Sequence, residues 1–229
     1  MKDKPVFGRG QRGIPIQHHF DMRKARKAQC ILAKMVSLAP PDEIHSICGM
    51  DVSYRGEDGF AAAVVLSYPE MEEIEAKTYH GKAPVPYMPG FLGFREMRFL
   101  APLFWRLATR ASAYIVNGHG AFHPEGLGAA SHFGVAFDVP AIGVCLSPLS
   151  FEGGSVDGDR LIAYGKEVGG IIRGPGGGRL LISAGHRMSP DRALEIVKAC
   201  MRGHRLPEPL FLADRYSKRT MEGRPTIGR

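Results

Sequence analysis

An acidic residue inside an apolar segment is the first feature of the sequence that could support chemistry. Asp51 lies near the middle of residues 47–54, which read as a strand. A buried carboxylate is costly unless a cation or a partner neutralises it, so Asp51 is a candidate metal ligand, with a structural ion pair as the alternative. Glu96, at the start of a predicted helix, is a second candidate. Its alternative role is an interaction with the helix dipole alone.

A second set of candidates follows a short apolar strand predicted over residues 113–116. Residues 117–120 read Asn-Gly-His-Gly, and α/β proteins place their ligand sites at this end of parallel strands. Glycine there allows a ligand to approach the backbone closely. His123 and His186 are further candidates, although an isolated histidine is more often a structural group. We expect a ligand site after this strand.

Residues 83–93 contain three prolines and two glycines and cannot form a regular element. This stiff segment presents the aromatic ring of Tyr87. A rigid aromatic tip can fill the gap left by a base that has been rotated out of a nucleic-acid stack. The alternative is a loop that caps the core.

Hydrophobic periodicity predicts the elements that position these residues. Three antiparallel strands are followed by parallel strands linked by helices, which is the order of the ribonuclease H-like α/β fold. The predicted strands cover 47–54, 60–68, 73–80, 113–116, 141–145, 167–173 and 179–183, and the predicted helices cover 21–36, 95–108, 128–137, 190–202 and 209–222. Asp157 and Asp159 are interpreted as marking a turn around Gly158.

Composition narrows the class of protein. The chain has 229 residues, of which 44% are hydrophobic and 23% charged, and this is a globular composition. The longest apolar stretches are far shorter than a membrane span, and residues 1–13 lack the apolar core of a secretory signal. We therefore expect a cytoplasmic protein with no membrane partner. The four cysteines lie far apart, without a CxxC pair, and are predicted to be buried thiols.

The net charge of +7 is unevenly distributed. Residues 1–35 carry nine Lys/Arg against two acidic residues, whereas residues 36–100 carry ten acidic residues against five basic ones. This distribution suits an enzyme that attracts a polyanion with its rim and holds cations at its centre. The alternative is a solvated basic helix with a loose tail. We expect a flexible basic arm over residues 1–20 and a single domain over residues 21–229.

Taken together, these segments resemble the endonuclease V family, which comprises deoxyinosine-directed nucleases with a ribonuclease H-like fold. The segments at 86–96 and 127–134 are specific in combination. The matching motifs lie at residues 49–53, 86–96, 117–124, 127–134, 140–144, 185–189, 205–209 and 212–215.

The resemblance implies a metal-dependent catalytic centre. Asp51, Glu96 and the residue at position 117 would hold Mg²⁺, or alternatively Mn²⁺, at the scissile phosphate. His123 and His186 would line the centre. A metal-activated water would cut DNA or RNA one nucleotide to the 3′ side of an inosine. The resemblance also implies a monomer.

The same resemblance implies a pocket for a flipped hypoxanthine base. Tyr87 would act as the wedge, and the pocket would read the edge of the base by main-chain hydrogen bonds. The residues implied for this pocket are Pro89, Gly90, Leu92, Gly118 and Gly128.

Two positions depart from the family pattern. Asn117 stands where the family has an aspartate, which removes a negative charge from a site for a hard cation. Leu146 stands where the family usually has a lysine, which removes a cation near the reacting phosphate. Three hypotheses follow: a weakened endonuclease V-type nuclease, a protein that reads a flipped base without cutting, and a scaffold that serves another phosphate or metal reaction.

Overall fold

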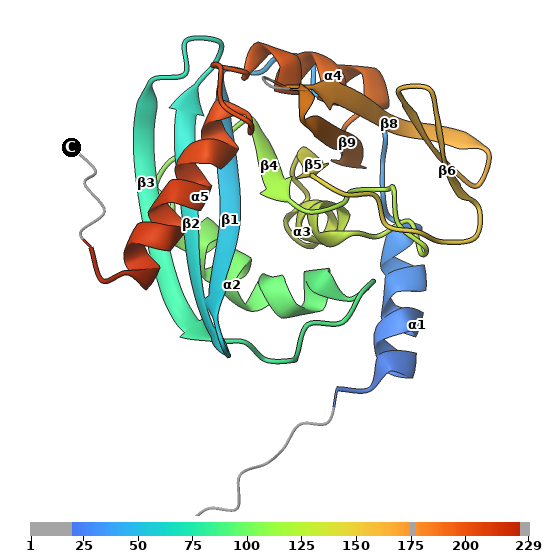
Figure 1. Ribbon diagram of the computed structural model, residues 1–229, viewed down its shortest axis with the longest axis horizontal. Coiled ribbons are helices and arrows are strands. Elements are labelled where there is room, and N and C mark those ends of the chain that lie inside the picture. The colour runs from blue at the N-terminus through green and yellow to red at the C-terminus, as the bar shows by residue number, and fades with distance from the viewer. Residues whose placement is uncertain (1–19, 175–176, 225–229) are drawn as a thin grey trace, which may run out of the picture.

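The computed structural model describes residues 20–174 and 177–224, so the basic arm predicted for residues 1–20 lies almost entirely outside the described residues. The described residues form one nine-stranded sheet and five helices (Figure 1). The strands are β1 (Ser46–Arg55), β2 (Asp58–Ser67), β3 (Glu73–Lys82), β4 (Ala113–Asn117), β5 (Ala141–Cys145), β6 (Gly154–Asp157), β7 (Arg160–Ala163), β8 (Lys166–Arg173) and β9 (Arg179–His186). The helices are α1 (Met22–Ala33), α2 (Leu92–Arg106), α3 (Ala129–Phe137), α4 (Pro190–Ala199) and α5 (Glu208–Met221).

The strand order is β3-β2-β1-β4-β5-β9-β8-β7-β6. Strands β1 to β3 form an antiparallel meander, and β4 and β5 run parallel to β1 and are linked through α3. This arrangement confirms the predicted ribonuclease H-like order of elements.

The far half of the sheet differs from the simplest expectation. Strand β9 runs antiparallel to β5, and β8, β7 and β6 continue antiparallel outward from it. The β6–β7 hairpin was predicted only as a turn, and Gly158 does occupy that turn with a φ of +59°. Each strand of the hairpin has four residues, and β6 is largely exposed, so the sequence carries little alternation by which to recognise them.

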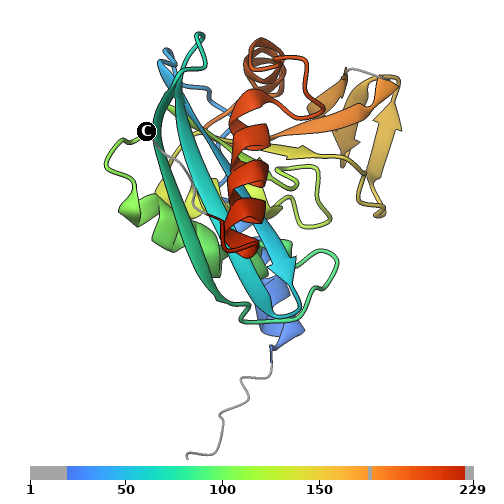
Figure 2. The same cartoon turned by 60° about the vertical axis from the view of Figure 1, so that its left-hand side comes forward.

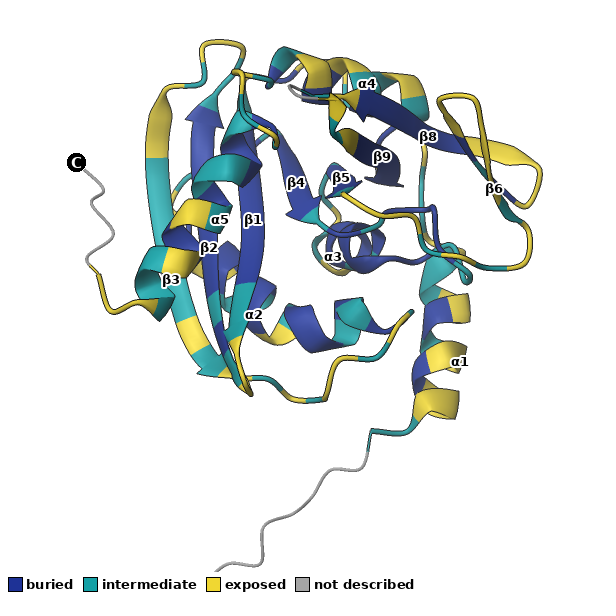
Figure 3. Ribbon diagram, in the orientation of Figure 1, coloured by how far each residue is buried: buried dark blue, intermediate teal, exposed yellow. Residues whose placement is uncertain are grey.

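Helices cover both faces of the central sheet. Helices α2 and α3 pack on one face of β1 and β4, while α5 covers the opposite face of β1 and β2 (Figure 2). The strands between them are buried, in contrast to the outer face of α1 and the β6–β7 hairpin (Figure 3). Helix α5 approaches β1 so closely that a Cβ atom on Gly49 would lie 2.1 Å from the Pro209 carbonyl oxygen.

The central strands separate where the candidate site begins. The parallel ladder between β1 and β4 ends with the pair Met50 and Val116. Asp51 and Asn117 are the next residues along the two strands; β4 ends at Asn117, whereas β1 continues to Arg55 beside β2. This places the site where parallel α/β sheets bind ligands.

Two predictions on local structure are wrong. Helix α2 begins at Leu92, not at residue 95, because a turn closes just before it: Phe91 N–H donates to the Met88 carbonyl at 3.0 Å, and Gly90 has a φ of +80°. Glu96 therefore lies in the second helical turn. Cys30 is exposed and Cys145 is half-buried, whereas Cys48 and Cys200 are buried as predicted.

In the part of the chain that the structure describes, no helix combines the length and the apolar character that a membrane crossing requires.

The contact between Gly49 and α5 gives a test of the packing. Gly49→Ala should lower the free energy of unfolding by about 1–3 kcal/mol, because the added methyl group meets backbone that cannot move aside alone. Urea denaturation measures the loss. Gly81→Ala is the control, because its Cβ would lie 3.4 Å from the nearest atom, in the Tyr79 ring. Equal stability of the two variants would contradict the packing argument.

Candidate functional site

The carboxylate of Asp51 is held from two sides. The side chain is 3% exposed on β1. Asn117, at the end of β4, donates from Nδ2 to Asp51 Oδ1 at 2.6 Å, and Ser217 on α5 donates from Oγ to Oδ2 at 3.0 Å. Ser53 Oγ lies 2.7 Å from Ser217 Oγ. Both oxygens of Asp51 therefore have a neutral hydrogen-bond donor, which satisfies the requirement for burying them.

Two further carboxyl groups surround Asp51. Burial raises the pKa of Asp51; the hydrogen bond from Asn117 opposes this effect, and the charge of Asp214 on α5 adds to it. Glu96 is 6% exposed. Burial, followed by the charge of Asp51, raises the pKa of Glu96 well above its usual range, and the Arg95 guanidinium only partly compensates. The centre thus carries more buried acid than its own cations neutralise.

An unpartnered hydroxyl lies beside these acids. Within the described residues, Tyr54 Oη is buried and has no hydrogen-bond partner. The Arg95 guanidinium lies 4.2 Å from the centroid of the Tyr54 ring and also donates to the Val85 carbonyl. Burial and the charge of Glu96 raise the pKa of Tyr54, so this hydroxyl is a neutral donor. A buried group left without a partner indicates a place for a ligand or a water molecule.

These residues offer oxygen ligands to a divalent cation. Carboxylate and amide oxygens suit Mg²⁺ or Mn²⁺ rather than a soft metal. Among the described residues, no three His, Cys, Asp or Glu side chains converge closely enough to hold a metal ion. Asp51, Glu96 and Asn117 would offer three oxygen ligands to a cation only after the Asn117 amide turns over, because its Nδ2 and not its oxygen faces Asp51.

A small cavity is formed by residues that neighbour this centre along the chain, and none of Asp51, Glu96 and Asn117 lines it. It has a volume of about 170 Å³ and is lined by Tyr87, Gly90, Leu92, Gly93, His119, His123, Gly128, Ala129, Ser147, Pro148 and Leu149. Four of the residues expected for the pocket, Tyr87, Gly90, Leu92 and Gly128, are therefore brought together. The size is well below the ~300–1,000 Å³ of pockets for drug-sized ligands, and it suits one small planar group.

The other two expected pocket residues, Gly118 and Pro89, do not line the cavity. Gly118 has a φ of +151°, and a Cβ there would lie 3.1 Å from Ala129 Cβ and 3.6 Å from Leu92 Cδ2. Pro89 precedes Gly90 in the turn that ends at Phe91. Gly118 thus permits close packing of the wall, and Pro89 stiffens its edge.

His123 is at the pocket, with both ring nitrogens engaged. Glu125 N–H donates to Nδ1 at 3.1 Å, and Nε2 lies 3.0 Å from the Gly90 carbonyl oxygen. Burial lowers the pKa of His123 to about 4. The ring is therefore neutral near pH 7 and donates from Nε2. This bonding suits a group that holds the turn at Gly90.

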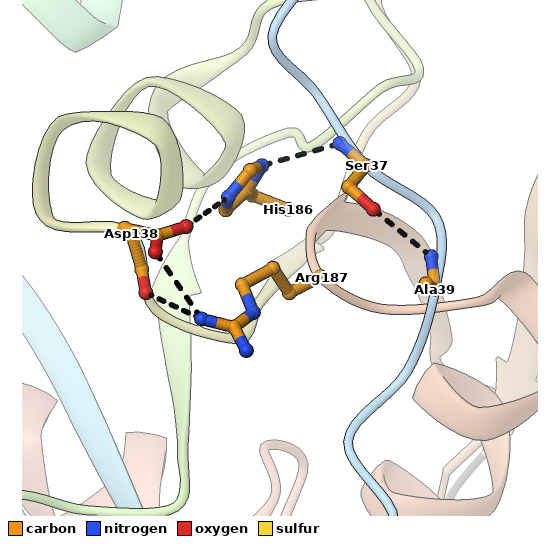
Figure 4. A network of polar contacts seen from close by, with 5 residues as sticks. All are labelled: Ser37, Ala39, Asp138, His186 and Arg187. Carbon is orange, nitrogen blue, oxygen red and sulfur yellow. Dashed lines mark hydrogen bonds and ion pairs between the residues drawn. The ribbon is translucent and has the colours of Figure 1, made fainter.

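His186 does not join the site. It pairs with Ala141, the first residue of β5, whereas the site lies at the other end of β4 and β5. Its Nδ1 accepts from Ser37 N–H at 3.2 Å, and its Nε2 lies 3.1 Å from Asp138 Oδ1 (Figure 4). His186 was expected in the catalytic centre. In the structure it instead connects the segment after α1 to the end of α3.

Sequence reasoning missed several residues of the site. Asp214 and Ser217 lie one turn apart on α5, and the segment containing Asp214 was recognised without a role for that residue. Residues 147–149 follow β5 and line the pocket; His119 lines it too and belongs to the segment 117–120 expected to form a ligand site. The position of these residues after parallel strands was the available signal.

Leu146 lies beside the pocket and not in it. It is 40% exposed and lines a neighbouring depression of about 500 Å³ with Val156, Ile171 and Leu181. Pro148 borders both hollows. An apolar side chain therefore occupies the position where the sequence resemblance places a cation, while the cationic Arg179 lines the same depression.

The buried acid predicts a pH-dependent stability. In metal-free protein, the folded state holds the proton of Glu96 above the ordinary pKa of 4.5, so wild-type stability falls as the pH rises from that value through the raised folded pKa. Glu96→Gln removes this loss. In the presence of a chelator, the free energy of unfolding of Glu96→Gln should exceed that of wild type. The difference should grow by up to about 1.4 kcal/mol per pH unit in this window.

Thermal unfolding between pH 4 and pH 8 measures this margin. Glu70→Gln, at an exposed position, is the control and should show no pH-dependent gain. A constant difference between Glu96→Gln and wild type would contradict the assignment.

Comparisons with known proteins identify the family of the chain. The family model described as Endonuclease V matches residues 31–215. The chain is 41% identical over 198 residues to endonuclease V of Methanopyrus kandleri, covering 82% of this chain and 84% of that protein. The catalytic domain of human endonuclease V superposes with a TM-score of 0.81 at 29% identity, covering 89% and 98% of the two chains.

A further solved structure resembles the chain at similar coverage. Endonuclease V of Ciona intestinalis, in complex with DNA containing an inosine followed by a ribo-adenosine, superposes with a TM-score of 0.79 at 27% identity, covering 88% of this chain and 98% of that one. The family model, the sequence relatives and the shared ribonuclease H-like architecture lead to one conclusion: this chain belongs to the endonuclease V family.

Proposed function

We propose that this protein binds inosine-containing DNA or RNA, takes the hypoxanthine base into the small cavity and hydrolyses the phosphodiester bond on its 3′ side. One observation carries this proposal: the residues that line the cavity are neighbours along the chain of a buried group of acids beside the end of β4. Leu92 and Gly93 line the cavity one helical turn before Glu96, and Gly118 follows Asn117 directly. A base in the cavity would bring its phosphate toward these acids.

Asp51, Glu96 and the Asn117 amide oxygen would hold Mg²⁺ or Mn²⁺. When bound, such an ion supplies charge neutralisation at the phosphate and lowers the pKa of a water nucleophile. Ser217 holds Asp51 in place through its hydroxyl. Asp214 contributes a further negative charge on the α5 side. His123 holds the turn that carries the pocket wall.

Tyr87 is suited to the wedge role. Its side chain is 66% exposed, although it also lines the cavity. An exposed ring at the mouth can occupy the place of a base that has left the stack, which offsets part of the cost of unstacking. The prolines on either side limit the freedom of the loop that presents it.

A second candidate function is a reader that binds the base and does not cut. The hydrogen bond from Asn117 Nδ2 to Asp51 at 2.6 Å favours it, because an amide N–H occupies a carboxylate oxygen that a cation would otherwise use. The apolar surface of Leu146 favours it as well.

Single-turnover cleavage separates the two functions. Excess protein is mixed with a labelled deoxyinosine duplex or an inosine-containing RNA, in Mg²⁺ and in Mn²⁺. We expect slow cleavage one nucleotide beyond the inosine, with Asp51→Ala at least about a hundredfold slower. Binding without cleavage in either metal would assign the reader function. Cleavage that survives Asp51→Ala would refute this site.

The departures from the family pattern predict a gain of function. Asn117→Asp with Leu146→Lys should raise the rate in Mg²⁺ by roughly a hundredfold or more, because the first change restores a carboxylate to the metal site and the second restores a cation near the reacting phosphate. Asn117→Asp with Leu38→Lys is the matched control. Leu38 is also 40% exposed, and it lies near the His186 end of the sheet. Equal rates for the two double variants would show that Leu146 does not limit the rate of cleavage.

A further inference from the structure

Gln29 is the one polar residue that α1 buries. The helix buries only Ala25 and Gln29, and its remaining side chains are exposed or half-buried. Gln29 is 3% exposed. A buried amide must find partners to offset the loss of water, so its contacts are informative.

The partner of Gln29 is the wall of the candidate base pocket. Its Nε2 donates to the Gly90 carbonyl oxygen at 2.8 Å, and His123 Nε2 lies 3.0 Å from the same oxygen. Because Glu125 N–H donates to His123 Nδ1, the neutral ring carries its proton on Nε2 and is also a donor. The Gly90 carbonyl therefore accepts two hydrogen bonds, one from each side.

Fixing this carbonyl fixes the peptide between Gly90 and Phe91. The N–H of the same peptide donates to the Met88 carbonyl at 3.0 Å, which closes the turn. Tyr87 lies just before this turn, and Leu92 lies just after it on the cavity wall. A rotation of this peptide would move the wall and the aromatic tip together.

Other contacts of α1 fall on the same two loops. The Phe20 ring, just before the helix, lies 5.6 Å from the Phe91 ring centroid. Arg26 lies 5.6 Å from the same centroid and forms an ion pair with Glu125 at 3.3 Å. Helix α1 thus joins the Gly90 turn to the loop that carries His123. Gln29 is the buried polar contact of this joint.

We propose that Gln29 is a positioning residue for base discrimination: through the Gly90 carbonyl, it holds the pocket wall in the form that distinguishes hypoxanthine from other bases. The discrimination half of this inference rests on the proposed function. The positioning half concerns the free protein and can be measured without any nucleic acid.

The test compares three variants. Gln29→Leu removes the donor and keeps the bulk. Gln29→Glu keeps the shape but places a carboxylate against the carbonyl oxygen at pH 8, whereas at pH 5 a protonated carboxyl could donate to it. Ala25→Gly, at the other buried position of α1, destabilises the helix without touching the contact and serves as the matched control.

The first readout is the ratio of dissociation constants for single-stranded oligonucleotides that carry adenosine or inosine at one position, in a chelator. We expect Gln29→Leu to lose roughly tenfold of the preference for inosine, with unchanged affinity for the adenosine oligonucleotide. Gln29→Glu should lose the preference for inosine at pH 8, and at pH 5 its preference should return toward that of wild type. Ala25→Gly should keep the preference.

The second readout is amide hydrogen exchange over residues 87–92 in the free protein. Gln29→Leu should accelerate exchange there by roughly tenfold, and Ala25→Gly should not. If Gln29→Leu exchanges at the wild-type rate, the inference is overturned. It is also overturned if wild type prefers inosine and Gln29→Leu keeps that preference. Faster exchange together with a wild type that shows no preference for inosine would support the positioning role and refute the proposed function instead.

Discussion

The burial of negative charge at Asp51 is the constraint on which the rest of the site depends. A carboxylate with 3% exposure is stable only if other groups are brought to it. The fold does so from separate parts of the chain, with Asn117 from the end of β4 and Ser217 from α5. The pairing of β1 with β4 ends at Met50, one residue before Asp51.

The neutral amide of Asn117 changes the energetics of this centre. Its hydrogen bond lowers the pKa of Asp51 and so opposes the effects of burial and of Asp214. A carboxylate at this position would instead add a like charge beside a buried one, a cost that only a bound cation could offset. Asn117 is neutral, so the protein avoids this repulsion without a bound cation. The same bond that stabilises the centre also reduces its demand for a metal.

The pocket is organised by groups that are neutral and already bonded. His123 has a pKa of about 4 and uses both ring nitrogens in the protein. His119 is also held neutral by burial, with a pKa of about 4. Such a wall presents main chain and uncharged rings, which suits recognition of an uncharged base by shape and hydrogen bonds. The charged chemistry lies next to the wall, at Asp51 and Glu96.

The sequence by itself determined the family and the element order apart from the β6–β7 hairpin, because apolar periodicity and the local motifs around Asp51, Glu96 and Tyr87 are contiguous in the chain. Tertiary structure alone decided which distant side chains meet. Gln29 reaches Gly90 and Ser217 reaches Asp51 through contacts between elements far apart in sequence, and no local pattern encodes them. His186 shows the converse. Its local motif matches, yet the antiparallel course of β9 carries it to the opposite end of the sheet.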